Sequence, residues 1–266
     1  MQHPGLVAAR AAALSVVVSV LCAAPLPADL PEVRVKGTLR VIAAKEEDPK
    51  MFSFAATGDP GFEREIVEGF ARLQGLKVEA VPAPTTADRI PLLTKGAGDV
   101  IIGIVVTDER RKLVSFTSEV LPARHLVVSH KPRPVLGTIE AFKASKIGLV
   151  KGTSWAQVAI EAGVPASSVE YFPERHAALA ALKEGRITGT VMSVPDFTLS
   201  TKRYPGLQAG VFIGPATSAA FAVRKGDTKL LAALNEYLEN LRKGPSWNRL
   251  VVKYFGEQAL AVLGRR

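Results

Sequence analysis

The residues best placed to do chemistry lie in the stretch 96–118, GAGDVIIGIVVTDERRKLVSFTS. Its apolar run over 100–106 is typical of a buried parallel strand, and the Thr-Asp-Glu that follows predicts a capped helix start. Arg110 comes directly afterwards. Open α/β sheets bind ligands just beyond the carboxyl ends of their strands, and a planar guanidinium suits a carboxylate or phosphate. Arg110 is therefore a candidate anion-binding residue; the alternative is that it only caps the sheet edge or pairs with Asp108 or Glu109.

A second candidate anion site is the Gly-Thr-Ser sequence that ends at Ser154, where a helix is predicted to start. Thr153 and Ser154 offer hydroxyls, and the helix start offers backbone N–H groups. A simple N-cap is the alternative. Ser193 and Asp196, which follow another predicted strand, add a hydroxyl and a carboxylate, although Asp196 can equally be a favourable charge in the first turn of a helix. These residues would come from a second lobe and face Arg110.

Signals for catalysis are sparse. The acidic turn 46–48 could take part in acid–base chemistry, although a solvated turn is the simpler interpretation. His125, His130 and His176 share no metal-ligand spacing, and we expect each to be an ordinary loop or surface histidine. Phosphate-loop, nucleophile-elbow and zinc motifs are absent from the sequence. We therefore predict no bound metal or cofactor and no enzymatic activity.

The composition allows one large or two modest domains, with 266 residues of which 47% are hydrophobic. Lys and Arg outnumber Asp and Glu by 34 to 25, which gives a formal net charge of +9. The basic residues are scattered, and no basic motif is interleaved with aromatic residues as in nucleic-acid-binding proteins. We expect a solvated basic surface and no nucleic-acid partner.

The first 28 residues are typical of a secretory signal peptide. A short region ending at Arg10 precedes the apolar stretch 11–24, and a Pro-Leu-Pro-Ala sequence then ends at Ala28, the predicted cleavage site. The only cysteine, Cys22, lies inside this segment, and Leu21 before it is too large for the usual lipidation motif. We predict export to the periplasm without a lipid anchor. A mature chain without cysteine has no disulfide and no thiolate metal site.

The pattern along the chain predicts the elements that would position these residues. Strands at 38–44, 76–81 and 100–106 alternate with helices at 62–73 and 88–95, which is the order of a doubly wound α/β lobe. A second cycle follows. Its strands are expected at 126–129, 146–150, 169–172, 187–192 and 217–224, and its helices at 139–143, 155–162, 174–184, 193–202, 227–241 and 247–255. The predicted fold class is α/β with two doubly wound lobes.

Several short motifs also follow one another in the order of a known family. They are Thr38-Leu-Arg-Val, Gly61-Phe-Glu-Arg-Glu-Ile, Gly98-Asp, Thr107-Asp-Glu-Arg, Val114-Ser-Phe-Thr-Ser, Gly148-Leu-Val-Lys-Gly-Thr, Ala181-Leu-Lys-Glu-Gly-Arg-Ile, Ala222-Val-Arg-Lys-Gly-Asp and Trp247 with Tyr254-Phe-Gly. In this order they resemble the family 3 bacterial extracellular solute-binding proteins, the polar amino-acid receptors of ABC importers. The resemblance covers nearly the whole mature chain.

The resemblance implies two α/β lobes joined by two hinge strands, which close on a ligand in the cleft between them. The first lobe would comprise 37–127, completed by 219–266, and the second lobe 128–218. The implied partners are a small-molecule ligand and an ABC-transporter permease in the inner membrane. The protein is expected to be a monomer.

The resemblance also implies a set of ligand contacts. Arg110 would clamp the α-carboxylate of an amino acid, and Phe52 would stack on the ligand. The predicted contacts are Arg110, Gly103, Val105, Phe52, Thr153, Ser154, Ser193 and Asp196.

Two departures from the family pattern leave the ligand open. Val105 replaces a Ser or Thr, and Ser193 stands where the family has an acidic residue for the ligand ammonium, for which Asp196 could substitute. A buried ammonium without a carboxylate would be left unpaired. The alternatives are a small anionic organic solute as ligand, an enzyme like the periplasmic cyclohexadienyl dehydratases with a proton donor in the turn 46–48, and a receptor that serves a redox or signalling partner.

Overall fold

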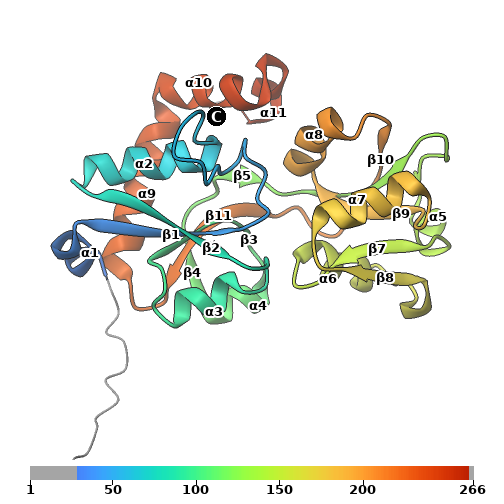
Figure 1. The fold of residues 1–266 in the computed structure, drawn as a ribbon, viewed down its shortest axis with the longest axis horizontal. Coiled ribbons are helices and arrows are strands. Elements are labelled where there is room, and N and C mark those ends of the chain that lie inside the picture. Colours follow the sequence, from blue (N-terminus) through green and yellow to red (C-terminus); the bar gives the residue numbers. More distant parts are fainter. Residues whose placement is uncertain (1–28, 264–266) are drawn as a thin grey trace, which may run out of the picture.

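The computed structural model describes residues 29–263, which form two α/β lobes lying side by side (Figure 1). The predicted signal peptide and Cys22 lie outside these residues. Each lobe is built on its own sheet, so the predicted α/β fold with two lobes is confirmed. Across residues 29–263, no helix is both long and apolar enough to cross a membrane.

The sheet of the first lobe has the strand order β2-β1-β3-β11-β4, with β5 paired to β11. Its strands are β1 (Thr38–Ala44), β2 (Lys77–Ala83), β3 (Val100–Val105), β4 (Val114–Phe116), β5 (Leu121–Pro122) and β11 (Ser218–Arg224). Strand β1 pairs in parallel with β2 and β3, whereas β11 is antiparallel to β3. The carboxyl ends of β1 and β3 therefore lie at the same edge of the sheet.

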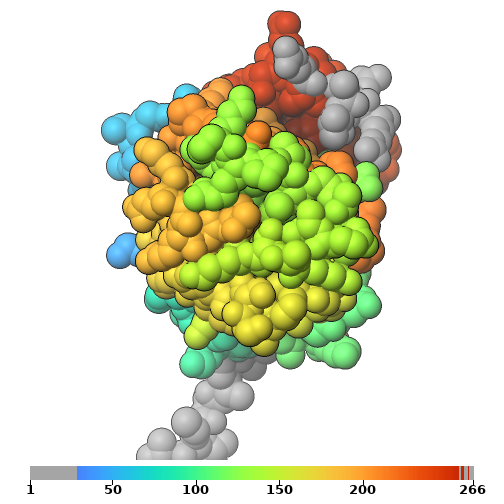
Figure 2. Space-filling view, turned by 90° about the vertical axis from the view of Figure 1, so that its right-hand side faces the viewer, coloured from blue at the N-terminus to red at the C-terminus, as the bar shows by residue number. Residues whose placement is uncertain are grey.

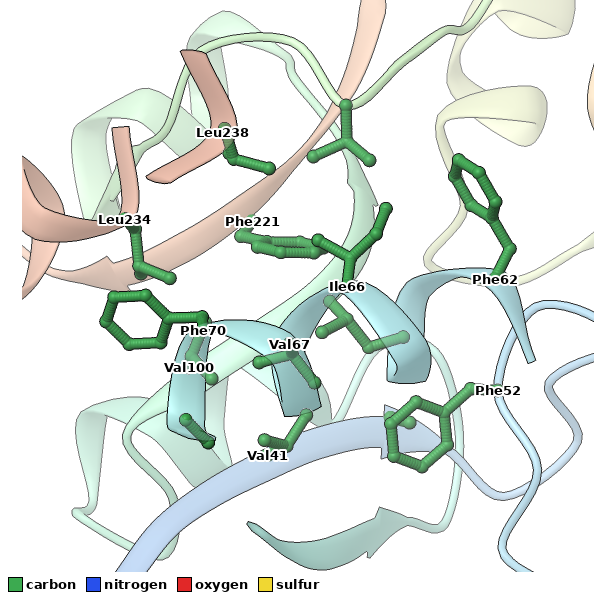
Figure 3. Packing of buried hydrophobic residues seen from close by; sticks show 14 of the residues in the cluster. Val41, Phe52, Phe62, Ile66, Val67, Phe70, Val100, Phe221, Leu234 and Leu238 are labelled. Atoms are coloured by element: carbon green, nitrogen blue, oxygen red, sulfur yellow. The ribbon is translucent and has the colours of Figure 1, made fainter. Parts of the chain in front are cut away.

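Helices from both ends of the described chain cover this sheet (Figure 1). They are α1 (Leu30–Lys36), α2 (Phe62–Leu73), α3 (Arg89–Thr94), α4 (Asp108–Leu113), α9 (Thr228–Lys243), α10 (Pro245–Phe255) and α11 (Leu260–Leu263), with the 3-10 turn η2 (Glu257–Ala259). The apolar residues Phe62, Ile66 and Phe70 of α2 are fully buried and pack between the sheet and α9 (Figure 3). Leu73, the last residue of α2, is 70% exposed.

The sheet of the second lobe has the strand order β10-β6-β9-β7-β8. Its strands are β6 (His125–His130), β7 (Ile147–Val150), β8 (Val169–Phe172), β9 (Gly189–Ser193) and β10 (Leu207–Ile213). The helices of this lobe are α5 (Ile139–Lys143), α6 (Ser154–Glu161), α7 (Arg175–Glu184) and α8 (Val194–Arg203), with the 3-10 turn η1 (Ala166–Ser168). Strand β7 is parallel to both β8 and β9. Figure 2 looks at this lobe end-on, with the C-terminal helices (red) rising above it.

The chain passes between the lobes twice, after β5 and again after β10. The two crossings are hydrogen-bonded to each other, because the N–H of Ala123 donates to the carbonyl of Thr217 at 2.8 Å. Since β6 pairs only with strands of the second sheet and begins at His125, the first crossing precedes the predicted division between 127 and 128.

Candidate ligand-binding site

A cavity of about 90 Å³ lies between the lobes, where the carboxyl-terminal ends of β1, β3 and β7 meet. The first lobe contributes Ala44, Glu46, Glu47, Thr86, Arg89, Gly103, Val105 and Arg110. The second lobe contributes Val150, Thr153, Ser154, Trp155, Arg175 and Asp196. Six of these fourteen residues are charged, with Glu46, Glu47 and Asp196 opposing three arginines. The cavity therefore suits a small polar solute.

The lobes touch across this cavity. The Arg110 guanidinium of the first lobe donates to the carbonyl of Gly152 in the second lobe at 3.0 Å. The Gln157 amide on α6 donates to the Glu109 carboxylate on α4, also at 3.0 Å. The structure thus has the closed arrangement of the two lobes, in which groups from both surround the cavity.

Arg110 is held in the cavity by neutral partners. Thr107 caps α4, and its hydroxyl accepts from the Arg110 N–H at 3.3 Å. The guanidinium donates to the carbonyls of Val105, at 2.8 Å, and Gly152. No carboxylate of residues 29–263 forms an ion pair with it, so the predicted alternative of pairing with Asp108 or Glu109 does not occur.

Burial, with a smaller contribution from the charge of Arg89, lowers the pKa of Arg110 to about 10. The guanidinium therefore remains protonated at neutral pH. A half-buried cation whose hydrogen-bond acceptors are neutral carbonyls favours an anionic partner, since these carbonyls offset only part of its desolvation. The geometry can accommodate a carboxylate at Arg110.

The N-terminus of α6 faces Arg110 from the second lobe. The Thr153 hydroxyl accepts from the N–H of Ala156 at 3.2 Å and donates to the carbonyl of Val150 at 2.7 Å. This hydroxyl is therefore occupied by capping, as the alternative interpretation of the motif predicted. The first turn of α6 still presents backbone N–H groups, which favour an anion.

His125, the first residue of β6, is buried at 1% exposure, so our expectation of a loop or surface histidine is wrong for it. Its Nε2 lies 3.0 Å from the Ser154 hydroxyl, and its Nδ1 is buried with no hydrogen-bond partner in the described part of the chain. Burial, with a further contribution from the Arg110 charge, lowers the pKa of His125 to about 4. The imidazole is therefore neutral at pH 7.

Asp196 lines the cavity, but its charge is already compensated. It forms an ion pair with Arg175 and a hydrogen bond with the hydroxyl of Ser193. Ser193 also caps α8, because its hydroxyl accepts from the N–H of Asp196 at 3.3 Å. Ser193 faces a smaller chamber behind the main cavity. Arg175 already neutralises the carboxylate of Asp196. Asp196 therefore adds little net negative charge for a ligand ammonium.

The acidic turn after β1 is not the solvated turn that we expected. Glu46 and Glu47 are half-buried and line the cavity. The Glu46 carboxyl meets that of Glu174 in the second lobe, and burial together with this hydrogen bond and the like charge raises the pKa of Glu46 to about 7. Burial also raises the pKa of Glu47, against the opposing charge of Arg175. Glu46 can therefore exchange a proton near neutral pH.

Phe52 lies outside the cavity lining and is fully buried in the first lobe. Its ring packs edge-on against Phe54 at 5.1 Å between centroids, and the loop before it is tied to α2 by the Glu63 N–H, which donates to the carbonyl of Met51 at 2.9 Å. The predicted ring stacking is therefore not available in this arrangement. The aromatic residue that does line the cavity is Trp155, directly after Ser154.

Two arginines at the site were missed by the sequence reasoning. Arg89 on α3 is buried and donates to the carbonyl of Ile102 at 3.1 Å. Arg175 begins α7 and pairs with Asp196. Each lies at a helix start where a charge is usually solvated, so no local signal distinguishes it.

The family model for the bacterial extracellular solute-binding proteins, family 3, matches residues 39–257. The chain therefore belongs to this family, as the motif order predicted. The family is one of extracellular solute-binding proteins, which implies a periplasmic or extracellular location.

Solved structures of amino-acid-binding proteins are similar over most of the chain. A mutant of ArgBP from T. maritima has a TM-score of 0.77 at 26% identity, covering 86% of this chain and 99% of that one. The ancestral amino-acid-binding protein AncCDT-1, a precursor of cyclohexadienyl dehydratase, has a TM-score of 0.77 at 27% identity, with coverages of 85% and 99%. An ancestral arginine-binding protein bound to arginine is 30% identical, with a TM-score of 0.72 and coverages of 83% and 99%.

Among curated proteins, the chain is similar to membrane-bound lytic murein transglycosylase F of Pseudomonas putida (strain GB-1). The identity is 27% over 238 residues, which are 86% of this chain and 48% of the relative. The chain thus spans about half the length of the curated relatives that it matches.

Proposed function

We propose that this protein is an exported receptor that captures a small polar solute bearing a carboxylate and presents it to an ABC importer. The observation that carries the proposal is Arg110, a half-buried cation whose hydrogen-bond acceptors are the neutral carbonyls of Val105 and Gly152. A carboxylate at this position would gain charge-assisted hydrogen bonds in a site screened from water.

The two-lobed arrangement supports the coupling of binding to closure. Arg110 comes from the first lobe, and the N-terminus of α6, which starts at Ser154, comes from the second. An anion held between them would contact both lobes only when they are closed and would shift the population towards that state. A permease that recognises the closed form would then receive only loaded receptor.

A thermal-shift screen tests this function directly. The purified protein would be heated with amino acids, dicarboxylates and aromatic acids, and a ligand at 100 times its Kd should stabilise the folded state by about 2.7 kcal/mol. Arg110→Ala should lose the shift. The matched control is Arg111→Ala, because Arg111 is the exposed neighbour on the same helix. An undiminished shift in Arg110→Ala would reject Arg110 as the anion clamp.

A second candidate function is a dehydratase resembling cyclohexadienyl dehydratase. It is favoured by Glu46, a cavity carboxyl with a pKa of about 7 that could donate a proton to a leaving hydroxyl. The likeness to AncCDT-1 adds to this candidate. Incubation with prephenate or arogenate, followed by absorbance of the aromatic product, tests it. Turnover that disappears in Glu46→Gln would support the enzyme, and absence of product would exclude it.

A further inference from the structure

A groove of about 490 Å³ lies between the lobes, outside the ligand cavity, and none of the described residues lines both. The C-terminal helices of the first lobe stand on one side of the groove, and α8 and β10 of the second lobe stand on the other (Figure 1). Its apolar walls are formed by Phe255, Ala259 and Leu263 from the first lobe and by Val194, Pro195 and Phe212 from the second. The proposed function does not use this groove.

The lining of the groove is mostly apolar. Of the nine described residues that form it, seven are apolar, and the exceptions are Thr198 and Arg124. Phe212 is 44% exposed, although it is a large aromatic residue. The Thr198 hydroxyl is already engaged, because it donates to the carbonyl of Val194 at 3.0 Å. A hollow of several hundred Å³ with apolar walls and few polar groups is typical of a small-molecule site.

The walls of the groove are held in place by hydrogen bonds within the chain. The indole N–H of Trp247 donates to the carbonyl of Leu263 at 2.7 Å and fixes α11 in the first-lobe wall. The N–H of Val194 donates to the carbonyl of Arg124 at 3.1 Å and ties the start of α8 to the crossing between the lobes. Because the groove is preformed in this arrangement, a ligand would not have to order its walls on binding.

Arg124 is the only charged residue among the described residues of the lining. It lies in the first crossing, between β5 and β6, and its guanidinium carbon is 4.1 Å from the centroid of the Phe212 ring. Within residues 29–263, the guanidinium forms no ion pair. A guanidinium that stacks on a ring through its face keeps its N–H edge for an anion, which binds in the plane of the group.

We propose that this groove binds a fatty acid, with the acyl chain against the apolar walls and the carboxylate on the N–H edge of Arg124. The charge of the lining favours an anion, because a cationic amphiphile would meet a like charge and a neutral one would leave the guanidinium to water. The volume is that of a small-molecule site, which favours an acid with a single chain. The site is distinct from Arg110 and does not depend on the solute bound there.

The test is isothermal titration calorimetry of the purified protein with octanoate, 1-octanol and octylammonium, all below their micellar concentrations. These probes share one chain and differ in the charge of the head. Octanoate should bind roughly tenfold more tightly than octanol, and octylammonium should bind most weakly. Hexanoate should bind about tenfold more weakly than octanoate, because it buries two fewer methylene groups.

Two variants locate the site. Arg124→Gln should reduce the affinity for octanoate to that for octanol. Arg203→Gln is the matched control, because Arg203 also lies over a ring, that of Tyr204, but does not line the groove. Thr198→Phe should abolish the binding of octanoate and octanol alike, since it places a ring in the groove from an exposed position of α8.

Three results would overturn the inference. The first is that octanoate does not bind, or binds no more tightly than octylammonium. The second is that binding of octanoate is lost in Arg110→Ala and kept in Arg124→Gln, which would place the acid in the ligand cavity. The third is a dimer in analytical ultracentrifugation that Thr198→Phe dissociates, which would assign the groove to a second copy of this chain.

Discussion

Protonation of His125 should make the free energy of unfolding depend on pH in the acidic range. Its pKa is about 4 in the folded protein, against 6.5 for an ordinary histidine. The folded state binds a proton at His125 less readily than the unfolded chain does. The full contribution of His125 to the free energy of unfolding is therefore present above pH 6.5. It is lost as the pH falls from 6.5 to about 4. A difference of this size corresponds to about 3 kcal/mol in the free energy of unfolding.

The perturbation is His125→Gln, which keeps a polar group near Ser154 and removes the titration. Urea unfolding, followed by tryptophan fluorescence at pH 7, 5 and 4, gives the free energy of unfolding of each protein. Half-buried carboxyls such as Glu46 have a raised pKa and act in the opposite direction, so the relevant quantity is the difference in the free energy of unfolding between wild type and variant. This difference should move by about 3 kcal/mol in favour of the variant between pH 7 and pH 4.

Ser154→Ala is the control for this prediction. It removes the hydrogen-bond partner of His125 but keeps the burial and the charge of Arg110 that lower its pKa. Its pH dependence should therefore follow that of the wild type. If the unfolding free energies of His125→Gln and wild type run parallel from pH 7 to pH 4, the imidazole is not held neutral by its surroundings, and the reasoning is refuted.

Two further predictions concern the strand and the lobe contact. Gly103→Ala should lower the free energy of unfolding by more than Gly37→Ala, because both have positive φ but only Gly103 would place its Cβ against Glu63. We expect about 1–2 kcal/mol for Gly37→Ala and additional loss for Gly103→Ala, and equal losses in urea unfolding would contradict the close approach. Gln157→Ala should change that free energy by less than about 0.5 kcal/mol, since its bond to Glu109 is exposed. It should nevertheless reduce the closed population measured by small-angle scattering with bound ligand; an unchanged scattering profile would show that this bond does not support closure.

Helices and strands with a regular pattern of apolar residues were predictable from the sequence. The helix predicted at 62–73 has the bounds of α2, in which the apolar residues Phe62, Ile66 and Phe70 recur every four positions. The apolar run gave β3 to within one residue. Strand β10 (Leu207–Ile213) was missed because its pattern is only partly buried, and β4 and β5 were missed because they have three and two residues. Their pairing to β6 and β11 depends on the tertiary fold.

The positions of some candidate residues were predictable because these residues follow the ends of strands. Arg110, Thr153, Ser154 and Asp196 line the cavity between the lobes, since the carboxyl ends of parallel strands converge there. That they bind a ligand stays a prediction. Arg89 and Arg175 were not predictable as site residues, since a charge at the start of a helix is usually solvated. Only the tertiary fold brings Arg89 to the carbonyl of Ile102 and Arg175 to Asp196.

The central claim is that Arg110 binds a ligand carboxylate between the lobes. The most direct measurement is calorimetric titration of the purified protein with the tightest-binding acid from the thermal screen and with the carboxamide of that same acid. We predict that the carboxamide binds roughly 100-fold more weakly to the wild type, and that Arg110→Ala removes this difference. Equal affinities of the wild type for the carboxylate and the carboxamide would contradict the claim.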